Sequence, residues 1–145
     1  MDAAGPDTRF RGRLVLVSST GVYGESKGGW VDEDTTGPAD ATGHVLLEGE
    51  RIAHGFGGRG VVLRLGGIYG PGRDRTVRRV VSGEATCPEP GVYGNRIHRD
   101  AAAGAARHLA RLADPDPVYL VVRPRSLLKN RGCRCAALAR RDDEE

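Results

Sequence analysis

Residues 14–24 have the sequence LVLVSSTGVYG, in which an apolar run is followed at once by small hydroxyl residues and a glycine. A short run of this kind is typical of a buried parallel strand that ends in a loop. A second unit of the same kind, VVLRLGGIYGPGR, occupies residues 61–73. Loops at the carboxyl ends of parallel strands are the usual ligand sites of open α/β sheets. The two units therefore predict part of a nucleotide-binding sheet.

The rest of the chain alternates between strand and helix patterns. The sequence predicts strands at 13–18, 61–65 and 118–122, and helices at 41–54, 75–82 and 101–113. Such alternation indicates a parallel sheet with right-handed crossovers. The predicted class is α/β, the C-terminal half of a Rossmann-type parallel sheet with about three strands and flanking helices. Four residues are expected to form the buried stripe of the first helix: Val45, Leu46, Ile52 and Ala53.

A glycine-rich turn follows the first predicted helix. Residues 55–60, GFGGRG, match the letters of the dinucleotide fingerprint Gly-x-Gly-x-x-Gly. That motif works only between a strand and a following helix, because the pyrophosphate lies at the helix N-terminus. Here the glycines follow a helix and precede a strand. We therefore interpret these glycines as a flexible turn.

A further helix is expected at 75–82, with Asp74 as its N-cap.

Length and composition limit the functional classes. The 145 residues correspond to one domain, with 39% apolar residues, 5% aromatic residues and 22 glycines. These figures predict a thin hydrophobic core. No run approaches the 18 or so apolar residues of a membrane span, and the chain does not begin with a signal peptide pattern. The sequence therefore predicts a cytoplasmic protein without a membrane partner.

The charge is unevenly distributed along the chain. Residues 1–122 carry as many acidic as basic side chains, so the net charge of +3 comes from residues 123–145. The body of the protein thus has no basic excess, and we expect no specific nucleic-acid partner. The expected organisation is a polar lead-in at 1–12, one domain at 13–122, and an Arg-rich tail that is either disordered or an out-of-frame extension. Cys133-x-Cys135 has no companion at zinc spacing, so no metal site is predicted.

Four segments in this order are similar to those of a known family. They are SSTGVYG at 18–24, WVDE at 30–33, RLGGIYGPGR at 64–73 and NRIHRD at 95–100. With these segments, residues 13–122 resemble extended or atypical short-chain dehydrogenase/reductases, the NAD-dependent epimerase/dehydratase family. The resemblance implies a doubly wound sheet, NAD or NADP as cofactor, and a nucleotide-sugar-like small molecule as substrate. It also implies a homodimer as a further expectation.

The sequence departs from the family pattern at two points. The glycine fingerprint of the family's first strand is absent, which indicates a truncated member that binds NAD or NADP weakly or not at all. The family's Tyr-x-x-x-Lys pair is replaced by Thr42 and Leu46, neither of which can transfer protons near neutral pH. The interpretation is a truncated nucleotide-sugar epimerase/dehydratase-like oxidoreductase. A non-catalytic NAD(P)-binding or sensing module and a non-functional gene remnant remain as alternatives.

The resemblance also assigns roles to individual residues. Ser19, with Thr20 beside it, corresponds to the hydroxyl that holds the reacting sugar oxygen, and Tyr23 is a substitute candidate for proton transfer. Arginine guanidinium groups match the geometry of phosphate oxygens, so the resemblance assigns Arg73 and Arg96 to the diphosphate of the substrate. The cofactor-binding candidates are Val17, Ser18, Gly66, Gly67 and Ile68, and the substrate-binding candidates are Tyr69, Arg73, Asn95, Arg96 and His98.

Overall fold

The computed structural model describes residues 12–24, 29–35, 37, 40–84 and 93–123, and the backbone of 127–128. The lead-in up to residue 11 and most of the predicted tail lie outside this part of the chain. The strands are β1 (Leu14–Ser19), β2 (Gly60–Leu65), β3 (Gly67–Tyr69), β4 (Tyr93–Gly94), β5 (Arg96–His98), β6 (Val118–Val121) and β7 (Leu127–Leu128). The helices are the 3₁₀ turn η1 (Thr20–Val22), α1 (Ala41–His54), α2 (Arg75–Val81) and α3 (Arg99–Leu109).

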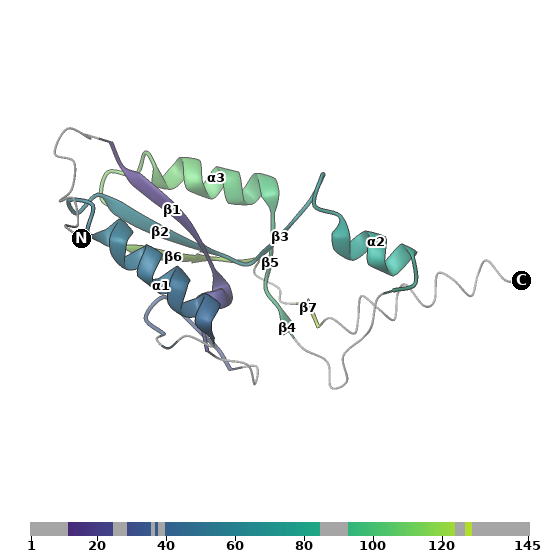
Figure 1. Cartoon of the computed structure of the whole chain (residues 1–145). Coiled ribbons are helices and arrows are strands. Elements are labelled where there is room, and N and C mark those ends of the chain that lie inside the picture. The colour runs from purple at the N-terminus through teal and green to yellow at the C-terminus, as the bar shows by residue number, and fades with distance from the viewer. Residues whose placement is uncertain are drawn as a thin grey trace, which may run out of the picture.

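The main sheet has three parallel strands in the order β1-β2-β6. Ser19 pairs in register with Leu65, and Leu65 pairs with Val121. The carboxyl ends of all three strands therefore lie at one edge of the sheet, as Figure 1 shows. This arrangement confirms the predicted α/β class and the three predicted strands.

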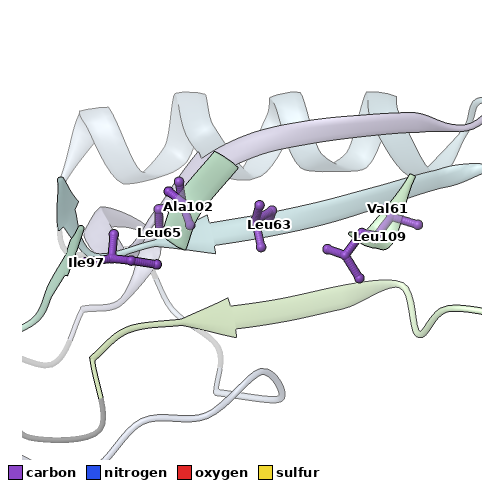
Figure 2. Packing of buried hydrophobic residues seen from close by; sticks show 6 residues of the cluster. All are labelled: Val61, Leu63, Leu65, Ile97, Ala102 and Leu109. Atoms are coloured by element: carbon purple, nitrogen blue, oxygen red, sulfur yellow. The ribbon is translucent and has the colours of Figure 1, made fainter. Parts of the chain in front are cut away.

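The central strand β2 separates two different interiors, because its side chains alternate between the faces of the sheet. Val61, Leu63 and Leu65 pack with Ala102 and Leu109 of α3, and together with Ile97 they form the apolar core in Figure 2. On the other face, Arg64 forms an ion pair with Glu50 of α1. One face of the sheet is thus closed by apolar packing alone, and the other combines buried apolar residues such as Val62 and Ala53 with a buried charge pair.

The two connections of the sheet have opposite hands. β1 leads through α1 to β2, and β2 leads through residues 66–117 to β6, so both steps move in the same direction across the sheet. The helices α1 and α3 nevertheless cover opposite faces (Figure 1). The prediction of right-handed crossovers is therefore wrong for one connection. The rule describes strand–helix–strand units, whereas the second connection leaves the sheet to form β3, α2 and β5 before α3 returns.

Beyond the carboxyl edge, the chain forms two small two-stranded sheets. β3 pairs in parallel with β5, with Ile68 opposite Ile97, and β4 pairs with β7. The sequence predicted only loops at 66–73 and 84–100. Three-residue strands carry no periodic signal, because their register is fixed by the neighbouring chain rather than by an apolar run. A Cβ at Gly66 would lie 3.0 Å from the backbone of Asn95, so this pairing requires glycine at position 66.

The helices differ in detail from their predicted form. α1 has its predicted bounds, and Asp40 caps it by accepting a hydrogen bond from the Gly43 N–H at 2.8 Å. Its predicted buried stripe is partly wrong, because Val45 and Ile52 are exposed. The face that packs on the sheet instead carries Gly43, Leu46, Glu50 and Ala53, of which Leu46 is half-buried.

The other two helices are shorter than predicted. α3 runs from Arg99 to Leu109 and ends where the Arg13 side chain donates a hydrogen bond to the Leu109 carbonyl at 3.0 Å. Asp74 stands at the N-cap position of α2 but makes no capping hydrogen bond, because its carboxylate pairs with Arg78 at 2.8 Å. No helix in the described part of the chain has the length and apolar character needed to cross a membrane.

We expect Gly104→Ala to stabilise the protein. Gly104 lies inside α3 with a helical backbone, and a Cβ there would meet nothing within 4 Å. Alanine lowers the conformational entropy of the unfolded chain, which is worth about 0.5–1 kcal/mol in a helix interior. Urea unfolding followed by circular dichroism should show a higher midpoint. An unchanged or lower midpoint would mean that this face of α3 is not open.

Candidate functional site

The turn after β1 presents the two hydroxyl residues singled out in the sequence. Ser19 caps η1, and its Oγ accepts a hydrogen bond from the Gly21 N–H at 3.1 Å. The turn closes where the Tyr23 N–H donates to the Thr20 carbonyl at 3.3 Å. Ser19 and Thr20 are half-buried at the carboxyl edge of the sheet. In the described part of the chain, the Ser19 hydroxyl hydrogen has no acceptor of its own, so it is available to a ligand oxygen.

Beneath this turn lies a buried polar cluster. Arg64 of β2 and Glu50 of α1 form an ion pair at 2.8 Å, with side chains only 8% and 4% exposed. Glu50 also accepts a hydrogen bond from the Ser18 hydroxyl at 2.6 Å, and Arg64 donates to the Tyr23 hydroxyl at 3.1 Å. Burial lowers the pKa of the Arg64 guanidinium, but its hydrogen bonds to Glu50 and Tyr23 outweigh that effect and leave the pKa above its ordinary value. Arg64 therefore stays charged at any accessible pH.

The acidic segment at 29–35 is fastened to the same cluster. Arg64 donates a further hydrogen bond to the Glu33 carbonyl at 3.0 Å. The Glu33 carboxylate accepts from the Leu120 N–H of β6 at 2.8 Å. Arg64, Glu50 and Glu33 are not among the site residues predicted from the sequence. A charged residue within the apolar run VVLRL was the available signal, because an arginine is rarely buried unless it is paired.

Tyr23 lies inside this cluster rather than at the surface. Its side chain is 7% exposed, and the Arg64 guanidinium carbon lies 5.1 Å from its ring centre. The hydroxyl of Tyr23 is thus held by a cation in the interior. This placement supports a structural role for Tyr23 over the proton transfer suggested by the sequence.

A cavity of about 760 Å³ opens beside β3 and the start of α2. Positive φ angles at Gly70 (135°) and Gly72 (78°) shape the turn that places Arg73 on this cavity. Four of the sequence candidates line it together: Ile68, Tyr69, Arg73 and Arg96. The pairing of β3 with β5 brings Arg96 across from Gly67, where a Cβ would lie 3.1 Å from the guanidinium.

The cavity has a basic lining. Arg73, Arg75 and Arg96 face it, and Asp74, its acidic neighbour, is paired with Arg78. Within the described residues, the guanidinium groups of Arg73 and Arg96 form no ion pair. Two guanidinium groups without an ion-pair partner among the described residues suit the binding of a doubly charged phosphate group.

Asn95 and His98 do not line the cavity. The Asn95 carbonyl accepts a hydrogen bond from the Gly67 N–H at 2.9 Å and so joins the two short strands. His98 caps α3, with Nδ1 accepting from the Asp100 N–H at 3.3 Å, and its ring packs edge-on against Tyr69 at 5.3 Å. Both residues position the wall of the cavity in this structure.

Comparison with known proteins gives relatives that match most of the chain. Protein YeeZ of Escherichia coli K12 is 32% identical over 120 residues, which are 81% of this chain and 42% of YeeZ. The structure of an NAD-dependent epimerase/dehydratase from Methylobacillus flagellatus is 35% identical, with a TM-score of 0.75, over 89% of this chain and 48% of that one. Most of the chain is therefore similar to part of an NAD-dependent epimerase/dehydratase.

Further comparisons agree in fold. The structure of MoeE5 in complex with UDP-glucose and NAD has a TM-score of 0.73 at 24% identity, over 88% of this chain and 48% of MoeE5. The chain thus spans about half the length of the proteins it matches. No family model matches it.

The residues described here do not by themselves provide the diphosphate site of an NAD-dependent epimerase/dehydratase. The N-terminal N–H groups of a helix commonly hold such a phosphate. In α1 and α3 the capping side chains of Asp40 and His98 each take one of these donors, the N–H groups of Gly43 and Asp100, and the Asp100 carboxylate adds negative charge to the first turn of α3. Nor do Gly66 and Gly67 need a cofactor to explain them, since Asn95 and Arg96 of the same chain pack against them.

Two further cofactor candidates, Val17 and Ser18, lie near the carboxyl end of β1. Val17 is 55% exposed on the edge strand β1, and the Ser18 hydroxyl is engaged by Glu50. In the described residues, no cluster of three or more potential metal ligands is present.

The helix α1 carries the positions of the acid–base pair that is usual in this family. Thr42 is exposed in its first turn, and the Leu46 Cδ1 lies 3.6 Å from the position of a Cβ on Gly21. Leu46 therefore packs on the turn that presents Ser19. An apolar side chain at that point can pack but cannot carry a proton.

Proposed function

We propose that this chain forms the substrate-side part of an NAD(P)-dependent, nucleotide-sugar epimerase/dehydratase-like oxidoreductase. The observation that carries the proposal is the basic cavity lined by Tyr69, Arg73 and Arg96. Its arginines suit the diphosphate of a nucleotide sugar, and Tyr69 offers a ring against which the nucleotide or sugar can pack. The carboxyl edge of a parallel sheet is the expected place for such a site.

In this proposal, the chain's own residues bind and orient the substrate. Arg73 and Arg96 hold the diphosphate, and the Ser19 hydroxyl donates a hydrogen bond to the sugar oxygen at which the reaction occurs. NAD or NADP, when bound, supplies hydride transfer. The described residues by themselves do not hold the diphosphate of this cofactor.

Calorimetric titration of the full chain with UDP-glucose, with UDP and with NADH tests the proposal. We expect both UDP-glucose and UDP to bind through the diphosphate, UDP-glucose more tightly because the Ser19 hydroxyl adds a contact to the sugar, and NADH to bind weakly or not at all. If neither UDP-glucose nor UDP binds to a chain that circular dichroism shows to be folded, the proposed function is wrong.

We expect Arg73→Ala and Arg96→Ala each to weaken UDP binding about tenfold or more, the effect of losing one charge-assisted hydrogen bond. The same titration measures the change. Arg107→Ala is the matched control, because Arg107 is exposed on α3 and lies outside the cavity lining. Equal affinities for all three variants would show that the cavity does not hold the diphosphate.

The alternative is a binding module without catalysis. Leu46 favours it, because it occupies the place of a proton-transfer group beside the turn of Ser19. A module of this kind would bind UDP-glucose but would not transfer deuterium, as deuteride, from a labelled sugar carbon to NAD or NADP. Loss of the label from the sugar, in the presence of either cofactor, would instead support the oxidoreductase.

A further inference from the structure

One buried ion pair holds both ends of the turn that presents Ser19 and Thr20. Ser18, just before the turn, donates to Glu50 at 2.6 Å, and Tyr23, just after it, accepts from Arg64 at 3.1 Å. Glu50 and Arg64 are themselves joined at 2.8 Å and are almost completely buried. The four residues between Ser18 and Tyr23 therefore span two fixed points on α1 and β2.

The same guanidinium reaches a second segment. Arg64 Nε and Nη2 donate to Glu50, while Nη1 donates to the Tyr23 hydroxyl and to the Glu33 carbonyl. Glu33 in turn bonds the backbone of β6 through its carboxylate. The planar guanidinium group of arginine can donate to all these acceptors at the same time, whereas a lysine ammonium on its flexible chain cannot.

We propose that Arg64 and Glu50 are positioning residues that fix the Ser19–Thr20 turn at the carboxyl edge, with the Tyr23 hydroxyl as its anchor. The proposal rests on the proposed function, in which Ser19 must meet the substrate oxygen in a defined place. It assigns Tyr23 to the support of the turn and not to proton transfer. It also explains why the interior of so small a sheet contains a charge pair.

Amide hydrogen exchange measured by NMR on the full chain tests the anchor. Tyr23→Phe removes only the hydroxyl, so we expect exchange at the amides of Gly21, residue 23 and Gly24 to accelerate about tenfold or more, as for the loss of one hydrogen bond to a charged group. The amides of Val62 and Leu63 in the sheet should change less than about twofold, because the ladder does not use this hydroxyl.

Two further variants make the test specific. Tyr119→Phe is the matched control, because the Tyr119 hydroxyl accepts a hydrogen bond from Asp116, in the loop that precedes β6. It should leave the turn unchanged. Arg64→Lys keeps the charge opposite Glu50 but loses the fork, so it should loosen the turn as Tyr23→Phe does. If Tyr23→Phe and Tyr119→Phe give the same exchange at the turn, the positioning role is overturned.

Titration of the same variants with UDP-glucose separates this proposal from the proposed function. If the wild-type chain binds UDP-glucose, we expect the affinity to fall in Tyr23→Phe and Arg64→Lys and to be kept in Tyr119→Phe. If the wild-type chain does not bind, the proposed function fails, and the exchange rates still decide whether the ion pair anchors the turn. Loosened exchange with unchanged affinity would overturn the positioning role for the substrate.

Discussion

Glu50→Ala should remove about 3–5 kcal/mol from the free energy of unfolding, the usual result of deleting one partner of a buried ion pair. The change leaves the Arg64 guanidinium in the interior without its carboxylate and the Ser18 hydroxyl without its acceptor. Domains of this size have total stabilities of only about 5–15 kcal/mol. Urea unfolding followed by circular dichroism should therefore show a largely unfolded or strongly destabilised chain.

The control for this variant is Glu48→Ala on the same helix. Glu48 pairs with Arg51 at 2.7 Å, but both side chains are mostly exposed. The hydrogen bond from Arg51 lowers the pKa of Glu48, yet solvent screens an exposed pair, so removal of the Glu48 side chain should have little effect on unfolding.

The double variant Glu50→Leu with Arg64→Met replaces the buried pair by apolar side chains. It should recover much of the unfolding free energy lost in Glu50→Ala. Similar midpoints for Glu48→Ala and Glu50→Ala would contradict the buried-pair interpretation.

The main sheet could be predicted from the sequence because its signals are local. The strands β1, β2 and β6 are apolar runs, and α1 ends at a glycine-rich turn. The stripe of α1 was predicted less well for a physical reason. Apolar periodicity selected Val45 and Ile52, whereas the helix turns Glu50 inward to meet Arg64. A polar contact across two elements leaves no periodic trace in either one.

The candidate site was predictable in its residues but not in its assembly. Tyr69, Arg73 and Arg96 were named from motifs, yet only the pairing of β3 with β5 brings Arg96 to the same cavity as the other two. That pairing joins two three-residue strands, which carry no apolar run. Glu33 shows the same limit, because its contact with Leu120 links residues 87 positions apart. Long-range polar contacts of this kind require the folded chain.

Gly60→Ala is expected to disrupt the junction between α1 and β2. A Cβ at Gly60 would overlap the Ala53 carbonyl oxygen and would lie 2.5 Å from its carbon. Both atoms belong to the backbone of α1, so no rotation of a side chain can relieve the contact. Either the last turn of α1 or the start of β2 must move, although β2 is the central strand of the sheet.

Overpacking of an interior usually costs about 1–3 kcal/mol, and a clash with fixed backbone belongs at or above the upper end of that range. We expect Gly60→Ala to lower the urea midpoint and to speed amide exchange at Leu14, whose N–H donates to the neighbouring Arg59 carbonyl. Gly49→Ala is the control, since a Cβ there meets nothing within 4 Å and the position is helical. It should be neutral or stabilising. A Gly60→Ala chain as stable as the wild type would show that the end of α1 and the start of β2 are further apart than this contact requires. The contact between Glu50 and Arg64 would then be contradicted as well, because it also depends on how α1 lies on the sheet.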